Sequence, residues 1–136
     1  QCLLDYVQLC GDETPDYVQA LGLPAIVARR VHDAVPWYEL AAYPAWAYLL
    51  DGEVRGQYGG TGTTWPWQRL DKHGSARMIV AGGLMPDNVR QAIRVARPWG
   101  VDVASGVEST PGVKDVDKMA AFIRRVREED ERGAQG

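Results

Sequence analysis

The sequence predicts an α/β fold built on parallel strands, and it favours a β/α barrel over an open sheet. Short apolar runs alternate five times with helix signals along the 136 residues, which is the pattern of strands joined by helical crossovers. The runs are apolar almost throughout, as expected for strands that are covered on both faces. Glycine-rich turns follow the third, fourth and fifth runs and not the first.

The position of these glycines separates the two architectures. An open doubly wound sheet usually binds its nucleotide at a G-x-G-x-x-G turn after the first strand, and this sequence has no such turn. A β/α barrel commonly builds its phosphate site from the loops after its last two strands. The glycine pattern therefore favours the barrel.

The first half of the chain gives three strands and two helices. Apolar and β-branched residues predict strands at 5–9, 25–31 and 46–50. The first helix is defined by Thr14 as its cap, Pro15 in its first turn and Gly22 at its end. A weaker helical pattern covers residues 35–43.

The second half gives two more strands and three helical segments. The predicted strands are 77–81 and 101–105. A short helix around 67–70 precedes the first of them, and a helix over 86–96 follows it. Asp115 is expected to cap the last helix, whose apolar face consists of Met119, Phe122, Ile123 and Val126. The charged stretch 124–133 predicts a fraying, solvated terminus.

Composition excludes two classes of partner. No apolar run approaches the roughly 20 residues of a membrane span, and a net charge of −3 with mixed signs gives no basic stripe for a nucleic-acid backbone. The 46% of hydrophobic residues suffice for the core of one domain. Two cysteines without a preceding signal peptide indicate a reduced, cytoplasmic setting. The first residue, Gln1, is not a start methionine, which indicates a piece of a longer protein.

Glycines at the ends of the last two strands predict a phosphate site. Phosphate needs several converging N–H donors, and glycine lets the main chain come close because no Cβ intervenes. Gly82, Gly83, Ser105 and Gly106 can supply such donors, unless they merely turn the chain out of the sheet. The loop after the third strand, with Gly59, Gly60, Thr61 and Gly62, lacks the P-loop pattern. It is interpreted as a mobile loop over the site.

Several segments together resemble the phosphoribosylanthranilate isomerase family of tryptophan biosynthesis. The matching segments occur in the family's order and spacing: VQLCGDE, YLLDG, YGGTGTTW, AGGLMPDNV and RPWGVDVASGVESTPGVKD. The resemblance implies a (β/α)₈ TIM barrel and an Amadori rearrangement of N-(5-phosphoribosyl)anthranilate without cofactor or metal. It further implies that residues 1–136 form a single partial barrel domain, about strands four to eight, without the N-terminal strands and their KICG motif.

The resemblance assigns the site residues one by one. Asp51 aligns with the family's general acid, which delivers a proton to the ribose ring oxygen; without the motif set it would be interpreted as a turn or cap residue. Gly82, Gly83, Ser105 and Gly106 fall where the family holds the phosphate. Thr63 in place of the loop's lysine and Met85 in place of a capping threonine depart from the pattern.

Cys10 is not assigned a catalytic role. The segment QLCG is similar to the family's KICG segment in the first strand, whose cysteine is the general base. The short separation of Cys10 and Asp51 along the sequence instead suits the fourth strand. The family usually has histidine there, and we expect a small, half-buried thiol. His32 and His73 stand apart from other ligand types, so no metal site is expected.

The sequence is compatible with three functions. The first is the isomerase, acting on a small phosphoribosyl substrate. The second is another phosphosugar barrel, which would need a second phosphate site and different residues at position 51. The third is a catalytically incomplete phosphate-binding fragment, or half of a split barrel whose partner is the missing N-terminal segment or another copy. Five strands cannot close such a barrel, so the isolated chain is expected to be inactive and prone to association.

Overall fold

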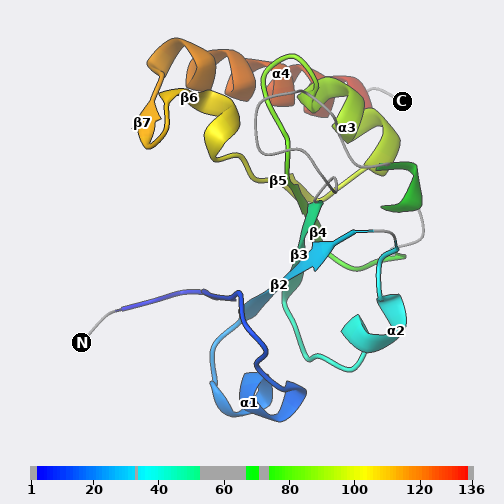
Figure 1. Cartoon of the computed structure of the whole chain (residues 1–136). Coiled ribbons are helices and arrows are strands. Elements are labelled where there is room, and N and C mark those ends of the chain that lie inside the picture. The colour runs from blue at the N-terminus through cyan, green and yellow to red at the C-terminus, as the bar shows by residue number, and fades with distance from the viewer. Residues whose placement is uncertain (1–2, 33, 53–66, 71–73, 135–136) are drawn as a thin grey trace.

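The chain folds around one five-stranded parallel sheet. The computed structural model describes residues 3–32, 34–52, 67–70 and 74–134 (Figure 1). The strands are β1 (Val7–Leu9), β2 (Ala25–Val31), β3 (Ala47–Gly52), β4 (Met78–Ala81) and β5 (Gly100–Val101). Each strand lies beside its sequence neighbour, in the order β1-β2-β3-β4-β5. A doubly wound sheet reverses its strand order at a switch point, and the described sheet does not.

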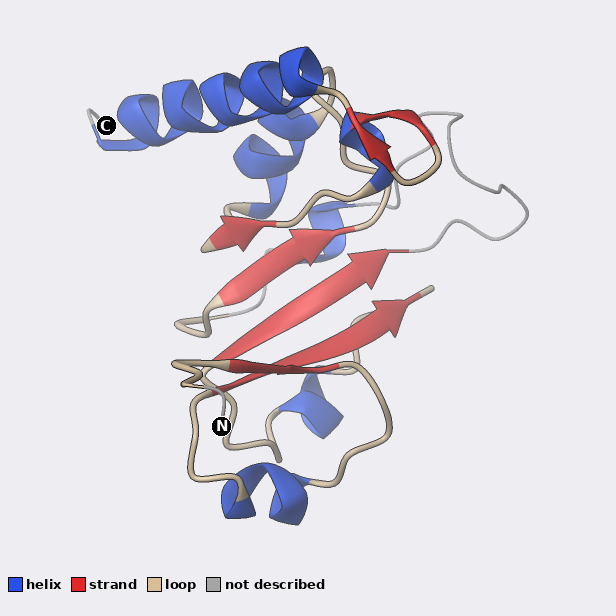
Figure 2. Ribbon diagram, turned by 90° about the vertical axis from the view of Figure 1, so that its left-hand side faces the viewer, coloured by secondary structure: helices blue, strands red, loops and turns tan. Residues whose placement is uncertain are grey.

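Helical segments connect the strands. They are α1 (Pro15–Ala20), α2 (Trp37–Leu40), the 3-10 turn η1 (Trp67–Leu70), α3 (Val89–Ala96), the 3-10 turn η2 (Ser105–Val107) and α4 (Val116–Ala134). Figure 2 shows the strands of this sheet running in one direction, so their carboxyl ends share one edge of the sheet. None of the helices over the described ranges is long and apolar enough to cross a membrane. The prediction of parallel strands alternating with helical segments is therefore confirmed.

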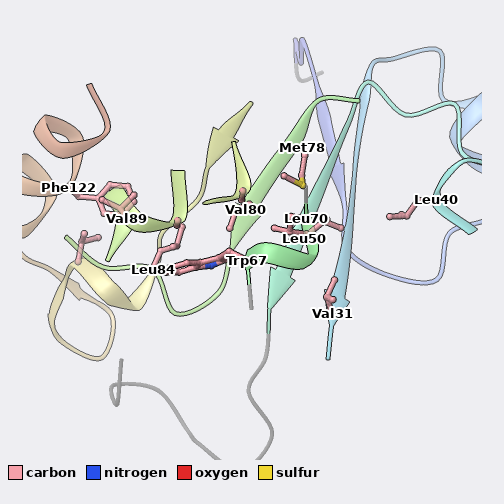
Figure 3. Packing of buried hydrophobic residues seen from close by; sticks show 13 residues of the cluster. Val31, Leu40, Leu50, Trp67, Leu70, Met78, Val80, Leu84, Val89 and Phe122 are labelled. Atoms are coloured by element: carbon pink, nitrogen blue, oxygen red, sulfur yellow. The ribbon is translucent and has the colours of Figure 1, made fainter. Parts of the chain in front are cut away.

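One face of the sheet carries the main core. Leu50 of β3 and Met78 and Val80 of β4 have no exposed side-chain surface. They belong to a cluster with residues of η1, α3 and α4 (Figure 3). Because side chains alternate along a strand, Asp51 points away from this core to the opposite face of the sheet. A second cluster joins α1 to β1 and β2.

The N-terminal half has the predicted elements in the predicted order, but β1 is shorter than the predicted 5–9 and α2 is shorter than the predicted 35–43. β2 has the predicted bounds, and Thr14 caps α1 by accepting a hydrogen bond from the Tyr17 N–H at 3.3 Å. β3 extends to Gly52, so Asp51 lies inside the strand end and not in the loop after it. Trp67 is buried in the main core.

The segment after β5 differs from the prediction. The strand predicted at 101–105 is limited to Gly100–Val101. The chain then leaves the sheet, forms η2, and continues into an antiparallel hairpin of β6 (Glu108–Thr110) and β7 (Val113–Lys114). No sequence pattern predicts this hairpin, because strands of three and two residues are too short to show periodicity.

The prediction of a fraying C-terminal stretch is wrong, because α4 continues through it to Ala134. Glu129 is only 7% exposed and receives two hydrogen bonds from Arg94 of α3, at 2.8 and 2.6 Å. Arg90 pairs with Glu128 as well. These contacts hold the charged end of α4 against α3. Ile123, predicted to be in the core, is 50% exposed, because α4 directs Phe122 toward the core instead.

Candidate functional site

Asp51 lies at the carboxyl edge of the sheet beside the loop after β4. Its Cα is in register with Ala81 of β4 and Arg30 of β2, and its side chain is half-buried. Gly82 follows Ala81 directly, with a φ of +89°. A β-carbon at position 82 would lie 2.6 Å from Asp51 Oδ1 and 2.3 Å from the Gly52 carbonyl oxygen. Only glycine therefore fits against the Asp51 carboxylate in this conformation.

A side-chain amide closes the loop after β4. Gly83 also has a positive φ, of +65°, and is exposed. Asn88 donates a hydrogen bond from Nδ2 to the Gly83 carbonyl oxygen at 2.8 Å, and its Oδ1 accepts one from the Met85 N–H at 2.9 Å. The helix predicted to begin at 86 consequently begins at Val89, after a turn.

Asn88 is not among the predicted site residues, although its residue type gives a usable signal. Asparagine side chains commonly bond to nearby main-chain groups and so favour turns and caps over helix interiors. In the segment PDN, the residue after two turn formers is the natural place for such a contact. Asn88 fixes the direction in which the Gly83 peptide faces.

The loop after β5 packs directly on the loop after β4. Gly106 lies within η2, and a β-carbon there would be 1.8 Å from the Leu84 carbonyl oxygen and 3.1 Å from Met85 Cα. Ser105 is exposed and Gly106 half-buried. The two glycine loops therefore form one continuous surface at the carboxyl edge of the sheet.

The structure thus brings together five of the predicted site residues. Asp51 adjoins Gly82, and the loop that contains Gly82 and Gly83 adjoins the turn that contains Ser105 and Gly106. Their catalytic and phosphate-binding roles stay predictions. The predicted active-site loop of Gly59, Gly60, Thr61 and Gly62 lies outside the described residues, as do Thr63 and His73.

Cys10 differs from its expected environment. Leu9 occupies the buried position at the end of β1, and Cys10, which follows it, is exposed and not half-buried. Its sulfur accepts a hydrogen bond from Gln8 Nε2 at 3.3 Å. Among the residues that the structure describes, no three histidine, cysteine or acidic side chains are grouped to hold a metal ion.

The family model and the curated relatives that match this chain belong to one family. The family model of N-(5'phosphoribosyl)anthranilate (PRA) isomerase matches residues 1–125. The N-(5'-phosphoribosyl)anthranilate isomerase of Magnetococcus marinus is 50% identical over 130 residues, which cover 93% of this chain and 60% of that protein. The chain thus spans about 60% of the length of such curated relatives.

Solved structures of phosphoribosylanthranilate isomerases have a similar fold. Phosphoribosyl anthranilate isomerase from Thermotoga maritima is 36% identical with a TM-score of 0.75, over 91% of this chain and 62% of that one. Another structure of the enzyme, 29% identical with a TM-score of 0.70 over 91% of this chain and 60% of that one, is a complex with reduced 1-(o-carboxyphenylamino)-1-deoxyribulose 5-phosphate.

Proposed function

The chain belongs to the N-(5'-phosphoribosyl)anthranilate isomerase family, and we propose that the protein carrying it catalyses this family's step in tryptophan biosynthesis. The reaction is the Amadori rearrangement of N-(5-phosphoribosyl)anthranilate to 1-(2-carboxyphenylamino)-1-deoxyribulose 5-phosphate. The observation that carries the proposal is the contact of Asp51 with Gly82, in the loop that packs on Gly106. A proton donor and two glycine loops are thereby neighbours on one edge of the sheet.

The glycine loops bind the substrate phosphate. Their main-chain N–H groups lie at the carboxyl ends of β4 and β5, and glycine at 83 and 106 permits a close approach of the phosphate oxygens. The contact between Gly106 and Leu84 fixes the spacing of the two loops. Phosphate contacts of this kind hold the substrate equally well before and during the reaction, so they govern affinity more than rate.

Asp51 opens the ribose ring. Cleavage of the bond between C1 and the ring oxygen requires a proton on that oxygen, and a carboxylic acid within hydrogen-bond reach supplies it. The substrate then becomes an open-chain protonated imine, and loss of the C2 proton gives the neutral enamine with a hydroxyl group on C2, which tautomerises to the ketose product. Asp51 lies at the end of the strand next to β4, and this neighbourhood supports binding of the ribose between Asp51 and the glycine loops.

Strands outside this chain complete the barrel. The sheet β1-β5 corresponds to strands four to eight of an eight-stranded barrel, as its unreversed parallel order and its 60–63% coverage of relatives support. The base that removes the C2 proton comes from the missing part. The isolated chain is consequently inactive, and its partner is the N-terminal barrel segment.

Replacement of Asp51 tests the proposal in the complete protein. Asp51→Asn keeps the size of the side chain and removes its transferable proton, so turnover falls by roughly 10²–10⁴-fold. Affinity for the reduced product analogue changes little. Asp16→Asn, in the exposed first turn of α1, is the matched control and keeps full turnover.

The same experiment separates the isomerase from a non-catalytic phosphate-binding protein. A wild-type protein that binds inorganic phosphate but shows no turnover of phosphoribosylanthranilate would favour the binding protein. Unchanged turnover in a folded Asp51→Asn variant would remove Asp51 from the mechanism.

A further inference from the structure

We infer that Lys114 is a positioning residue for the phosphate site, a role that rests on the proposed function. Lys114 lies in β7, outside both glycine loops. Its ammonium group donates to the Ala104 carbonyl oxygen at 2.8 Å and to Glu108 Oε1 at 2.7 Å. Ala104 precedes η2 and Glu108 follows it, so one side chain bridges both ends of the turn that holds Ser105 and Gly106.

The hairpin places Lys114 where it can make this bridge. Glu108 of β6 and Lys114 of β7 are directly paired across the antiparallel strands, and residues in such pairs have neighbouring side chains. The Gly112 N–H at the hairpin turn also donates to Glu108 Oε2 at 3.1 Å. A role for the hairpin follows, because it presents an ammonium group to the main chain of the turn.

Glu108 is kept ionised in this arrangement. The hydrogen bond from Lys114 and, after it, the one from the Gly112 main chain hold the pKa of the Glu108 carboxyl below its ordinary value. Its side chain is 16% exposed, against 45% for Lys114. Hydrogen bonds between charged partners are shorter and stronger than neutral ones. Glu108 therefore fixes the Lys114 ammonium group beside the Ala104 carbonyl.

The turn is held from two further directions. Gly106 rests on the Leu84 carbonyl group, and the Val107 carbonyl oxygen accepts a hydrogen bond from the Asp115 N–H at 2.8 Å. Lys118 donates from Nζ to the Glu108 carbonyl oxygen at 2.6 Å, but it does not bond to Ala104. Among these contacts, the bridge from Lys114 is the one that joins both ends of the turn.

The consequence concerns phosphate affinity and not the chemical step. A bound phosphate needs N–H donors within about 2.7–3.2 Å and well aligned. A Lys114→Met variant keeps the apolar stem and frees the Ala104 carbonyl and Glu108, so η2 loses its fixed orientation. The N–H of Gly106 then spends less time in the binding geometry. Ring opening at Asp51 is unaffected once the substrate is bound.

The test compares three variants of the complete protein. Inorganic phosphate is titrated while the Gly83 and Gly106 amide signals are followed by NMR, and kcat and KM are measured with phosphoribosylanthranilate. Lys114→Met raises the phosphate Kd and KM about tenfold, the worth of one charged hydrogen bond, and leaves kcat within about twofold. Lys114→Arg restores the affinity to within about threefold. Lys118→Met removes the same charge and a bond to Glu108, and it changes the Kd less than threefold.

Each contrary outcome has a distinct meaning. A folded Lys114→Met variant with a lower melting temperature but wild-type phosphate Kd would make Lys114 merely structural. Equal losses of phosphate affinity in Lys114→Met and Lys118→Met would show that positive charge near the site determines the affinity, and not the positioning of η2 by Lys114. If Lys114→Met does not fold, Glu108→Ala removes the acceptor that holds the Lys114 ammonium group beside the Ala104 carbonyl, and an unchanged Kd there overturns the inference. A wild-type protein with neither phosphate binding nor turnover would instead contradict the proposed function.

Discussion

Substitution of Gly106 by alanine tests how the two glycine loops fit together. A β-carbon at this position would lie 1.8 Å from the Leu84 carbonyl oxygen and 2.8 Å from its carbonyl carbon. Both atoms belong to the main chain, so no side-chain rotation relieves the clash. The loops would have to part by about 1.6 Å to reach the 3.4 Å of an ordinary contact.

A displacement of this size is large on the scale of a hydrogen bond. The N–H···O distance ranges over only about 0.5 Å among good hydrogen bonds, so phosphate cannot bond to both loops at once. Loss of one charged hydrogen bond costs about 1.5–3 kcal/mol. We therefore expect the phosphate Kd and the KM for phosphoribosylanthranilate to rise about 10- to 100-fold, with a much smaller change in kcat.

The measurement is a phosphate titration of the folded Gly106→Ala variant of the complete protein, together with steady-state kinetics. Gly100→Ala is the matched control, because a β-carbon there meets Ile79 Cγ1 at 3.6 Å, an ordinary contact. The control keeps wild-type affinity. Wild-type affinity in Gly106→Ala itself would show that phosphate binds without the two loops in this arrangement.

Three further predictions concern the acid, the core and the end of α4. Gly82→Ala forces a β-carbon against Asp51 Oδ1 and the Gly52 carbonyl oxygen, so kcat should fall together with phosphate affinity; an unchanged kcat would contradict the placement of Asp51. Met78→Ala should lower the free energy of unfolding by about 2–5 kcal/mol, since Met78 is fully buried. The control Val113→Ala, at an exposed position, should change it by less than about 0.5 kcal/mol, and denaturant titration measures both values. The hydrogen bond from Arg94 holds the pKa of Glu129 below its ordinary value of 4.5. The stability that this pair contributes is thus present above about pH 4.5 and is lost as the pH falls through the lower folded value, and Glu129→Gln should weaken this acid dependence in unfolding curves.

The sheet and the order of its strands were predictable because their signal is repeated along the chain. Most of the strands contain several apolar residues, as in 25–31. Gly82 and Gly106 were singled out by their residue type, by their place after the last two predicted strands and by the family resemblance. Their close contacts with Asp51 and Leu84 depend on how distant segments pack, and no local pattern expresses that.

The errors have physical causes that act over long distances. The stretch 124–133 has the composition of a solvated terminus, but Glu129 finds Arg94 thirty-five residues earlier in the chain. Tertiary contact therefore overrides the local signal and keeps α4 helical. In the same way, Lys114 gains its role only because the short hairpin β6-β7 returns it to Ala104.

A crystal structure of the complete protein with reduced 1-(o-carboxyphenylamino)-1-deoxyribulose 5-phosphate tests the central claim most directly. We predict that the phosphate oxygens lie within about 3.2 Å of the Gly83 and Gly106 N–H groups and that the sugar chain passes the Asp51 carboxylate. A phosphate bound elsewhere, or N–H groups of both glycines directed into the protein interior, would contradict the assignment of this site.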